Sequence, residues 1–255
     1  MRDDEKVVIG WIDGGTIHSG FAAYLCQLLL NRNDRITGQV AASGPYLSLN
    51  RNEMVELFLQ TDADWLLSID TDLCIPIESF DSLIESADKL NRPIVAGKYY
   101  LPFDNGANII PSAQTMNNND PDPEKMGQWV TPEMLASAPV LDGLHSVGIG
   151  YVLIHRDVFL SIRAVNPDKK FPWFRDEWKE SWDAWVSDDL SFFNQVRGLG
   201  INIALNTQAT STHLKQFGIN DDVFLQRMTS QNAHEHNHHM HPNKKLSWWN
   251  GKKKQ

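Results

Sequence analysis

The sequence predicts an α/β protein with a mostly parallel central sheet and helices on both faces. Between Lys6 and Tyr100, short apolar runs typical of buried strands alternate four times with stretches whose apolar residues recur at helical spacing. Parallel strands need crossover helices between them, so this order implies a sheet covered on both sides. Ligands bind at the carboxyl ends of the strands in such folds, and functional residues are therefore expected there.

Length and composition limit the class of protein. The chain has 255 residues, enough for one α/β domain or two small ones, and a formal net charge of −9. That charge opposes non-specific binding to nucleic acid or anionic lipid, although a local basic patch can overrule it. The sequence has no apolar run of about 18 residues and no signal-peptide core. We therefore expect a soluble, cytoplasmic protein without a membrane partner, and Cys26 and Cys74 as free thiols.

The first predicted strand, Lys6 to Trp11, ends in Asp13-Gly14-Gly15 before a helix with Phe21, Tyr24, Leu25, Leu28 and Leu29 at helical spacing. Glycines at this turn let the backbone approach a ligand, and the helix start offers N–H groups to an anion. A plain tight connection explains the glycines equally well. Asp13 stands where the carboxyl end of the strand would meet a ligand.

A second strand is predicted over Ile36–Ala42, and the next helix from about Asn50, with Glu53 placed for a capping interaction. Arg51 would lie in the first turn, where a cation is unfavourable against the helix dipole. Either an external anion or a surface salt bridge accounts for Arg51. The predicted buried face of this helix is Met54, Val55, Leu57 and Phe58.

The third strand is an apolar run from Asp64 to Ile69 that stops at Asp70 and Asp72. Alternate side chains of a strand point the same way, so these two carboxylates would project together. They would repel each other unless a cation lies between them, which favours a divalent metal site. The alternative is that they cap the helix after Pro76. That helix carries Phe80, Leu83, Ile84, Ala87 and Leu90.

A fourth strand over Pro93–Tyr100 is followed by residues 101–142, which are rich in Asn, Pro, Asp and Gly. This composition predicts a long functional loop or a lid. The next strand, Leu144–Ile154, contains Gly148 and Gly150, which indicates a bulge or a ligand against bare backbone.

After a helix over Asp157–Val165, the segment 171–185 is aromatic and acidic. Trp178, Trp182 and Trp185 are spaced for one helical face, which fits a core; a stacking wall for a sugar ring or a base is the alternative. Ser187-Asp188-Asp189 then begins a helix with Leu190, Phe193 and Val196 on its apolar face.

A strand over Ile201–Leu205 leads to His213, which is either a satisfied polar residue or a third metal ligand. Residues 220–255 are predicted as a helix and a tail rich in His, Lys and Trp. The tail could bind transition metals or a nucleic acid strand, and a solvated tail is the simpler interpretation.

Several motifs occur in a consistent order along the chain. They are the Gly14-Gly15 turn, Arg51-Asn52, Ile69-Asp70-Thr71-Asp72, Pro93-Ile94-Val95-Ala96-Gly97, Val147 to Ile154, Pro172-Trp173-Phe174, Ser187-Asp188-Asp189 and Thr212-His213-Leu214. Their joint order, which spans roughly residues 7 to 219, resembles that of glycosyltransferases of the GT-A fold. The similarity is closest to the compact family 2-like enzymes often encoded by bacteriophages. It implies a single Rossmann-like GT-A domain over residues 1–219.

For the donor side, the resemblance implies that Asp72, and less directly Asp70, hold Mn²⁺ or Mg²⁺ against the diphosphate of a nucleotide-sugar. His213 would be a further ligand, and the mixed carboxylate and imidazole set favours Mn²⁺. The metal would neutralise charge on the leaving diphosphate. The residues expected to contact the nucleotide-sugar are Asp13, Gly15, Arg51 and Asp70.

For the transfer step, the resemblance implies a catalytic base before the long helix. The family commonly has Glu-Asp there, whereas this chain has Asp188-Asp189, which shortens the first acid. Asp189 would remove the proton from the acceptor hydroxyl, and the anomeric centre would be inverted. In a retaining enzyme this role would lapse. Gly148, Trp173 and Phe174 would line the acceptor side.

The predicted function is therefore a metal-dependent glycosyltransferase. Its acceptor could be a hydroxymethylated pyrimidine in phage DNA, a virion protein or a glycan. A nucleotidyltransferase would normally need a glycine- and lysine-rich phosphate loop, which Asp13–His18 does not offer. A non-catalytic sugar- or nucleotide-binding module is the third alternative, and the joint presence of Asp70, Asp72, Asp189 and His213 argues against it.

Overall fold

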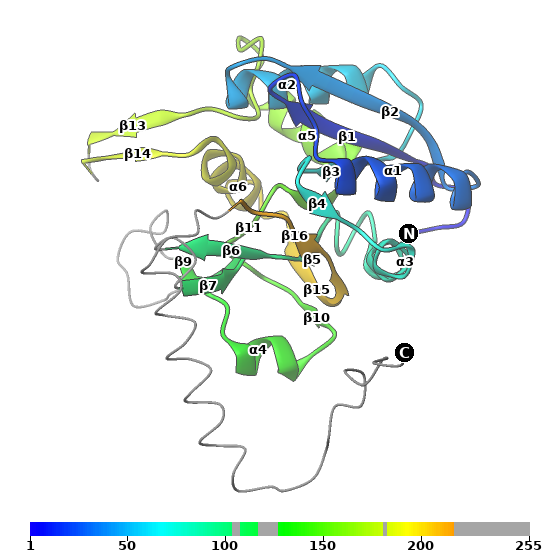
Figure 1. Cartoon of the computed structure of the whole chain (residues 1–255). Coiled ribbons are helices and arrows are strands. Elements are labelled where there is room, and N and C mark those ends of the chain that lie inside the picture. The colour runs from blue at the N-terminus through cyan, green and yellow to red at the C-terminus, as the bar shows by residue number, and fades with distance from the viewer. Residues whose placement is uncertain (104–107, 117–126, 181–182, 217–255) are drawn as a thin grey trace, which may run out of the picture. The chain divides into compact units, whose positions relative to one another are not determined.

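The computed structural model describes residues 1–103, 108–116, 127–180 and 183–216 (Figure 1). The chain divides into two units, Met1–Lys215 and Gln216–Gln255, and every helix and strand below belongs to the first. The predicted C-terminal helix, the histidine-rich tail and Trp182 lie outside the described residues. No helix in the described part of the chain is long and apolar enough to cross a bilayer. Cys26 and Cys74 are free, as predicted.

The first unit is built on a seven-stranded sheet with the order β10-β15-β5-β12-β3-β1-β2. Strands β1, β2, β3, β5 and β15 share one direction, while β10 and β12 run antiparallel to their neighbours. The predicted mostly parallel α/β sheet is therefore confirmed. Its strands are β1 (Val7–Asp13), β2 (Ile36–Ser43), β3 (Trp65–Ile69), β5 (Ile94–Lys98), β10 (Val140–Leu141), β12 (Tyr151–His155) and β15 (Ile203–Thr210).

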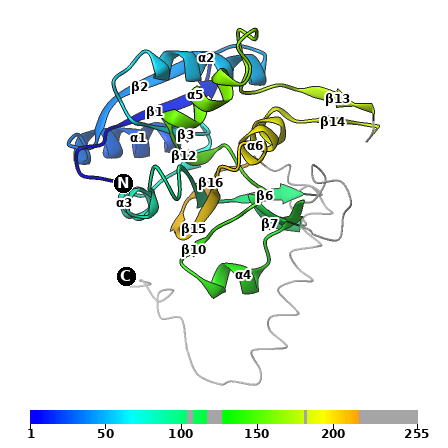
Figure 2. The same ribbon diagram turned by 180° about the vertical axis from the view of Figure 1, so that it is seen from behind.

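Helices cover both faces of this sheet, as Figure 2 shows from behind. Side chains on alternate positions of a strand enter different cores: Val7 packs in one apolar cluster and Val8 in the other. Helices α1 (Ser19–Asn31) and α3 (Ile77–Ser86) close the cluster of Val7. Helices α2 (Leu47–Leu59), α5 (Arg156–Ala164) and α6 (Asp188–Gly198) close the cluster of Val8.

Two helices differ from their predicted boundaries. Helix α2 begins at Leu47, a full turn before Asn50, so Arg51 lies in its second turn. Leu57, predicted as buried, is 39% exposed because the buried face follows the helical spacing of Met54, Val55 and Phe58, and Leu57 lies beside that face. Helix α3 ends at Ser86, and Leu90, beyond it, is 81% exposed.

The segment 101–142, predicted as a long loop or lid, carries short secondary structure in its described part. These elements contain only two to six residues each and are interrupted by Pro, Asn and Ser, so they show no apolar period long enough to recognise in the sequence. They are β6 (Tyr100–Phe103), β7 (Asn108–Pro111), β8 (Ala113–Met116), β9 (Gly127–Trp129), α4 (Pro132–Ser137) and β10. Strand β11 (Ser146–Val147) joins β8 and β9 in a small sheet.

Trp178 and Trp185 do not lie on a helix. They lie opposite each other in an antiparallel hairpin of β13 (Glu177–Lys179) and β14 (Ala184–Val186). Their rings meet edge to face with centroids 5.8 Å apart, and they are 47% and 70% exposed. The interpretation of these two residues as helical core is therefore wrong, because they pair across two strands and remain exposed.

Candidate active site

A pocket opens at the carboxyl ends of β1 and β3, and we call it the strand-end pocket. Its volume of about 370 Å³ lies within the range of small-molecule sites. Four residues that the sequence singles out for donor or metal binding line it together: Asp13, Arg51, Asp70 and Asp72. The remaining lining residues are Ile12, Gly14, Gly44, Pro45, Leu47, Asn50 and Thr71.

Asp13 is held at the end of β1 by a local turn. Its Oδ1 accepts hydrogen bonds from the Gly15 backbone N–H and from Ser43 Oγ on β2, both at 2.8 Å. These two bonds lower the pKa of Asp13, so its carboxylate is ionised at neutral pH. Gly15 has φ of 98°, a left-handed conformation that favours glycine. Gly15 therefore allows the backbone conformation of this turn, and the turn orients Asp13.

Asp70 and Asp72 lie in a turn immediately after β3, in which the Leu73 N–H donates to the Asp70 carbonyl. Helix α3 has Pro76 at its N-cap and no side-chain capping bond, so the alternative role of these acids as helix caps is wrong. Burial raises the pKa of Asp70, against the attraction of Arg51. Both carboxylates instead border the strand-end pocket.

His213 reaches Asp72 through a short strand pair. Strand β16 (Thr212–His213) runs antiparallel to β4 (Leu73–Cys74), which places His213 Nε2 3.2 Å from Asp72 Oδ1. His213 Nδ1 lies 2.7 Å from the Tyr100 carbonyl oxygen, which can only accept, so Nδ1 carries a proton. His213 Nε2 then either carries a second proton toward Asp72 or presents its lone pair to a cation.

Lys215 is a further cation at Asp72. Its Nζ lies 2.6 Å from Asp72 Oδ2. Burial alone would raise the pKa of Asp72, but His213 and Lys215 hold it at about 2. Lys215 was not among the predicted site residues, although it follows the Thr212-His213-Leu214 motif directly.

The described residues contain no cluster of three or more His, Cys, Asp or Glu side chains that could hold a metal. Of the three predicted metal ligands Asp70, Asp72 and His213, the structure brings Asp72 and His213 into direct contact. Mg²⁺ commonly binds proteins through one or two carboxylates plus substrate phosphates and water. The pair fits a metal whose remaining ligands come from the diphosphate, with the imidazole favouring Mn²⁺.

Arg51 forms a salt bridge, as one of its two predicted explanations requires, but does so in the interior and not on the surface. Its Nη1 lies 2.7 Å from both carboxylate oxygens of Asp188 at the start of α6, and both side chains are below 10% exposed. Burial opposes both charges and raises the pKa of Asp188, whereas Asp188 raises the pKa of Arg51; two contacts this short favour the charged pair. Arg51 Nε has no partner among the described residues. The pair links the strand-end pocket to α6.

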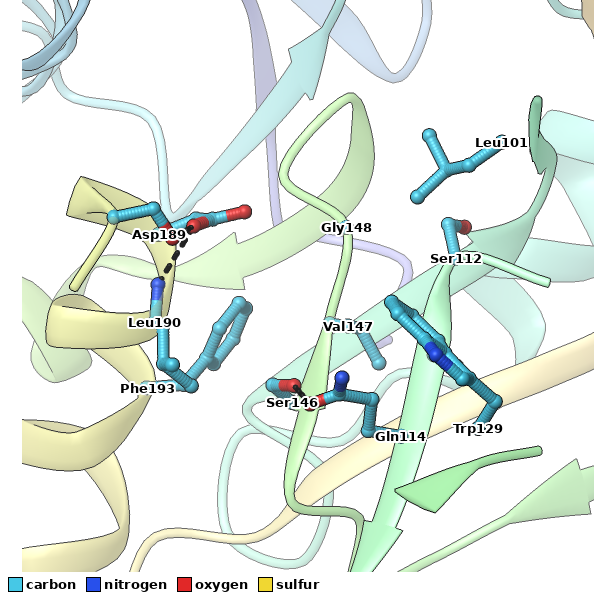
Figure 3. Close-up of a pocket in the computed structure, with 12 residues that line it drawn as sticks. Leu101, Ser112, Gln114, Trp129, Ser146, Val147, Gly148, Asp189, Leu190 and Phe193 are labelled. Atoms are coloured by element: carbon cyan, nitrogen blue, oxygen red, sulfur yellow. Dashed lines mark hydrogen bonds between the residues drawn. The ribbon is translucent and has the colours of Figure 1, made fainter. Parts of the chain in front are cut away.

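A second pocket, which we call the α6 pocket, is lined by Ser187 and Asp189, the two neighbours of Asp188 in the sequence. Asp189 borders it, with Oδ1 accepting from the Leu190 N–H at 2.8 Å and from Ser187 Oγ. In Figure 3 Asp189 lies on one side, Ser112 and Trp129 on the other, and Gly148 between them. Its volume is about 150 Å³. The lining is Leu101, Ser112, Ala113, Gln114, Trp129, Ser146, Val147, Gly148, Ser187, Asp189, Leu190 and Phe193.

The glycines between β11 and β12 make room for protein side chains. A Cβ on Gly148 would lie 2.0 Å from the Tyr99 hydroxyl oxygen, and one on Gly150 2.3 Å from Asp70 Oδ2. The Gly150 N–H donates to the Tyr99 hydroxyl at 3.3 Å, and burial raises the pKa of Tyr99. Tyr99, another residue that sequence analysis missed, thus lies against the backbone between Asp70 and the α6 pocket.

Trp173 and Phe174, predicted on the acceptor side, are placed in the core. Trp173 is fully buried and its Nε1 donates to the Phe159 carbonyl at 2.8 Å. Phe174 is 2% exposed and stacks on Phe192 of α6 with centroids 4.7 Å apart. The acceptor-side role that the resemblance implies for Trp173 and Phe174 does not fit this burial, since the two rings pack α6 against α5.

Comparisons with known proteins support the fold and not an activity. No model of a protein family matches the sequence, and no curated protein matches it. The crystal structure of A197 from STIV is similar over 83% of this chain and 86% of that chain, with a TM-score of 0.54 and 14% identity. The crystal structure of GalNAc-T7 with UDP, GalNAc and Mn²⁺ is similar over 84% of this chain and 44% of that chain, with a TM-score of 0.49 and 9% identity. The fold is GT-A-like, as predicted.

Proposed function

We propose that this protein is a metal-dependent glycosyltransferase that moves a sugar from a nucleotide-sugar to an acceptor hydroxyl. The observation that carries the proposal is the gathering of Asp13, Arg51, Asp70 and Asp72 around one pocket, with Asp189 and Gly148 in the next. These residues come from distant parts of the chain, and each is a site residue predicted from the sequence. A donor site beside an acceptor site is what the transfer reaction requires.

In the proposed donor site, Asp72 and His213 hold Mn²⁺ or Mg²⁺. The metal supplies Lewis-acid assistance by neutralising charge on the leaving diphosphate. Asp13, fixed by Gly15 and Ser43, accepts hydrogen bonds from the nucleotide. Lys215, beside Asp72, adds positive charge where the diphosphate would lie.

In the proposed acceptor site, Asp189 is the general base. Its carboxylate borders the α6 pocket, and the bonds from Ser187 and Leu190 fix Oδ1. It would take the proton of the acceptor hydroxyl as the oxygen attacks the anomeric carbon, which inverts that centre. The acceptor classes are a hydroxymethylated pyrimidine in DNA, a virion protein and a glycan.

A screen of nucleotide-sugars for Mn²⁺-dependent hydrolysis tests the proposal, because slow hydrolysis reports the donor without knowledge of the acceptor. We expect one donor to be hydrolysed and to bind in calorimetric titration only with Mn²⁺ present. Asp72→Asn should weaken this binding by about 10- to 100-fold. Asp62→Asn, at an exposed acid outside both pockets, is the control and should bind as wild type. Donor binding that does not depend on a metal would overturn the metal site, and no donor binding at all would overturn the function.

A further inference from the structure

We propose that the acceptor is a neutral carbohydrate and that the α6 pocket binds its sugar ring. Trp129 provides a face for the ring, and Ser112 provides a partner for one of its hydroxyl groups. This inference rests on the proposed function and narrows its acceptor. Three features of the pocket carry it: an unpartnered buried hydroxyl, an aromatic wall and the absence of cations among its described lining residues.

The hydroxyl of Ser112 is the first feature. Ser112 lines the α6 pocket between β7 and β8, is only 3% exposed, and its Oγ has no hydrogen-bond partner among the described residues. Its backbone is fixed, since its N–H donates to the Tyr99 carbonyl and its carbonyl accepts from the Gly148 N–H at 2.6 Å. Leaving a buried hydroxyl unpaired is unfavourable. A rotation about one side-chain bond would offer this hydroxyl to a ligand in the pocket.

The aromatic wall is the second feature. Trp129 is 41% exposed and lies on the side of the pocket opposite Asp189 (Figure 3). Next to it, Gln114 Oε1 accepts from Ser146 Oγ at 3.0 Å, which orients the carboxamide. A sugar ring has apolar C–H faces and polar hydroxyls at its rim. An aromatic face with neutral polar groups beside it matches both.

The charge of the lining is the third feature. No Lys, Arg or His occurs among the described residues that line the pocket, and Asp189 is the sole charged one. The hairpin that leads into the pocket through Ser187 has four acids, Asp176, Glu177, Glu180 and Asp183, against Arg175 and Lys179 in residues 175–183. A DNA acceptor needs cations along its phosphates, since these dominate its affinity. A neutral acceptor does not.

The same hairpin gives a longer carbohydrate a second surface. Val186 ends β14, and Ser187, the next residue, lines the pocket. Trp178 and Trp185 therefore lie on a ribbon continuous with the pocket wall, and both rings are largely exposed. Exposed aromatic rings with acids between them suit stacking on neutral sugars that precede the one in the pocket.

The test is binding of an array of neutral glycans, including hexasaccharides of glucose, mannose and N-acetylglucosamine, to the full chain without a donor. We expect at least one glycan to bind. Ser112→Ala should weaken its binding about fivefold without lowering the melting temperature, because the removed hydroxyl has no partner to lose. Trp129→Ala and Trp185→Ala should weaken binding about tenfold. Leu30→Ala, at an exposed leucine on α1, is the control and should bind as wild type.

A DNA duplex that carries 5-hydroxymethylcytosine is the competing probe. The inference is overturned if this duplex accepts sugar and no neutral glycan binds, or if Ser112→Ala and Trp129→Ala bind the glycan as wild type does. Hydrolysis of the donor in the same preparation separates the two proposals. Metal-dependent hydrolysis with no glycan binding defeats this inference alone, whereas a chain that hydrolyses no nucleotide-sugar defeats the proposed function.

Discussion

The two pockets of the molecule are built in opposite ways. The strand-end pocket draws its charged groups from the carboxyl ends of β1 and β3 and from α2, and its described lining contains Asp13, Asp70 and Asp72 beside one cation, Arg51. The α6 pocket is assembled from strands of two to four residues and one helix, and its described lining is neutral apart from Asp189. The difference teaches that, in the proposed reaction, charged groups would bind and activate the donor, while shape and neutral hydrogen-bonding groups would select the acceptor.

The largest expected effect separates the chemistry from the binding. Asp189→Asn should lower the rate of sugar transfer by about 10²- to 10⁴-fold, because it removes the proposed base. The dissociation constant of the nucleotide-sugar, measured by calorimetry, should stay unchanged since Asp189 lies outside the strand-end pocket. Asp62→Asn, at an exposed acid outside both pockets, is the control. Normal turnover of Asp189→Asn would show that the base has been assigned to the wrong residue.

The boundary between the pockets should depend on the buried ion pair. Arg51→Met and Asp188→Leu, made singly, should each lower the free energy of unfolding by about 3–5 kcal/mol, because each leaves a buried charge unpaired. The double variant should recover most of that loss. Urea denaturation measures all three. Arg92→Met breaks an exposed pair with Asp142 and should cost at most about 1 kcal/mol; equal losses for Arg51→Met and Arg92→Met would contradict the buried pairing.

A smaller effect on stability is expected at Gly148, whose backbone lines the α6 pocket. Gly148→Ala should destabilise the protein by about 1–3 kcal/mol, because its Cβ would meet the Tyr99 hydroxyl. Adding Tyr99→Phe should restore part of the loss, as measured by thermal unfolding. Gly198→Ala, where a Cβ meets nothing within 4 Å, is the matched control. A Gly148→Ala variant as stable as wild type would mean that Tyr99 does not fill this gap.

The smallest effect is a difference in salt dependence. Raising the ionic strength should weaken nucleotide-sugar binding to the strand-end pocket about threefold, because partly exposed charges are screened. Binding of a neutral glycan to the α6 pocket should not change, since its described lining offers no cation. Parallel titrations in low and high salt measure both. Equal salt dependence of the two ligands would remove the contrast between the pockets.

The strand-end pocket could be located from the sequence because its residues stand next to strong local signals. Asp13 and Asp70 each follow an apolar run, and parallel strands bring their carboxyl ends to one edge. His213 was predicted as a site residue, but no local pattern indicated its contact with Asp72. That contact depends on the pairing of β16 with β4. The central sheet was predictable for the same reason: long apolar runs report strands reliably.

The α6 pocket could not be assembled in this way. Ser112 lies between two short strands and Trp129 at the end of another; these strands are too short to show a period, within a segment that composition alone describes as loop. Trp173 shows the opposite error, because an aromatic residue near a motif serves a core as often as a ligand, and only packing decides. Arg51 has a partner 137 positions away that no local pattern indicates.

The distance in sequence between Arg51 and Asp188 affects the order in which parts of the protein can fold. During synthesis α2 emerges well before α6, so Arg51 has no counter-ion until Asp188 leaves the ribosome. Contacts between distant positions form late, because a long loop must close first. The described lining of the strand-end pocket lies within residues 12–72 and is synthesised together with β1, β2 and β3, whereas the described lining of the α6 pocket comes from residues 101–193. A chain that stops before α6 therefore contains the lining of the strand-end pocket but lacks Asp189, His213 and Lys215.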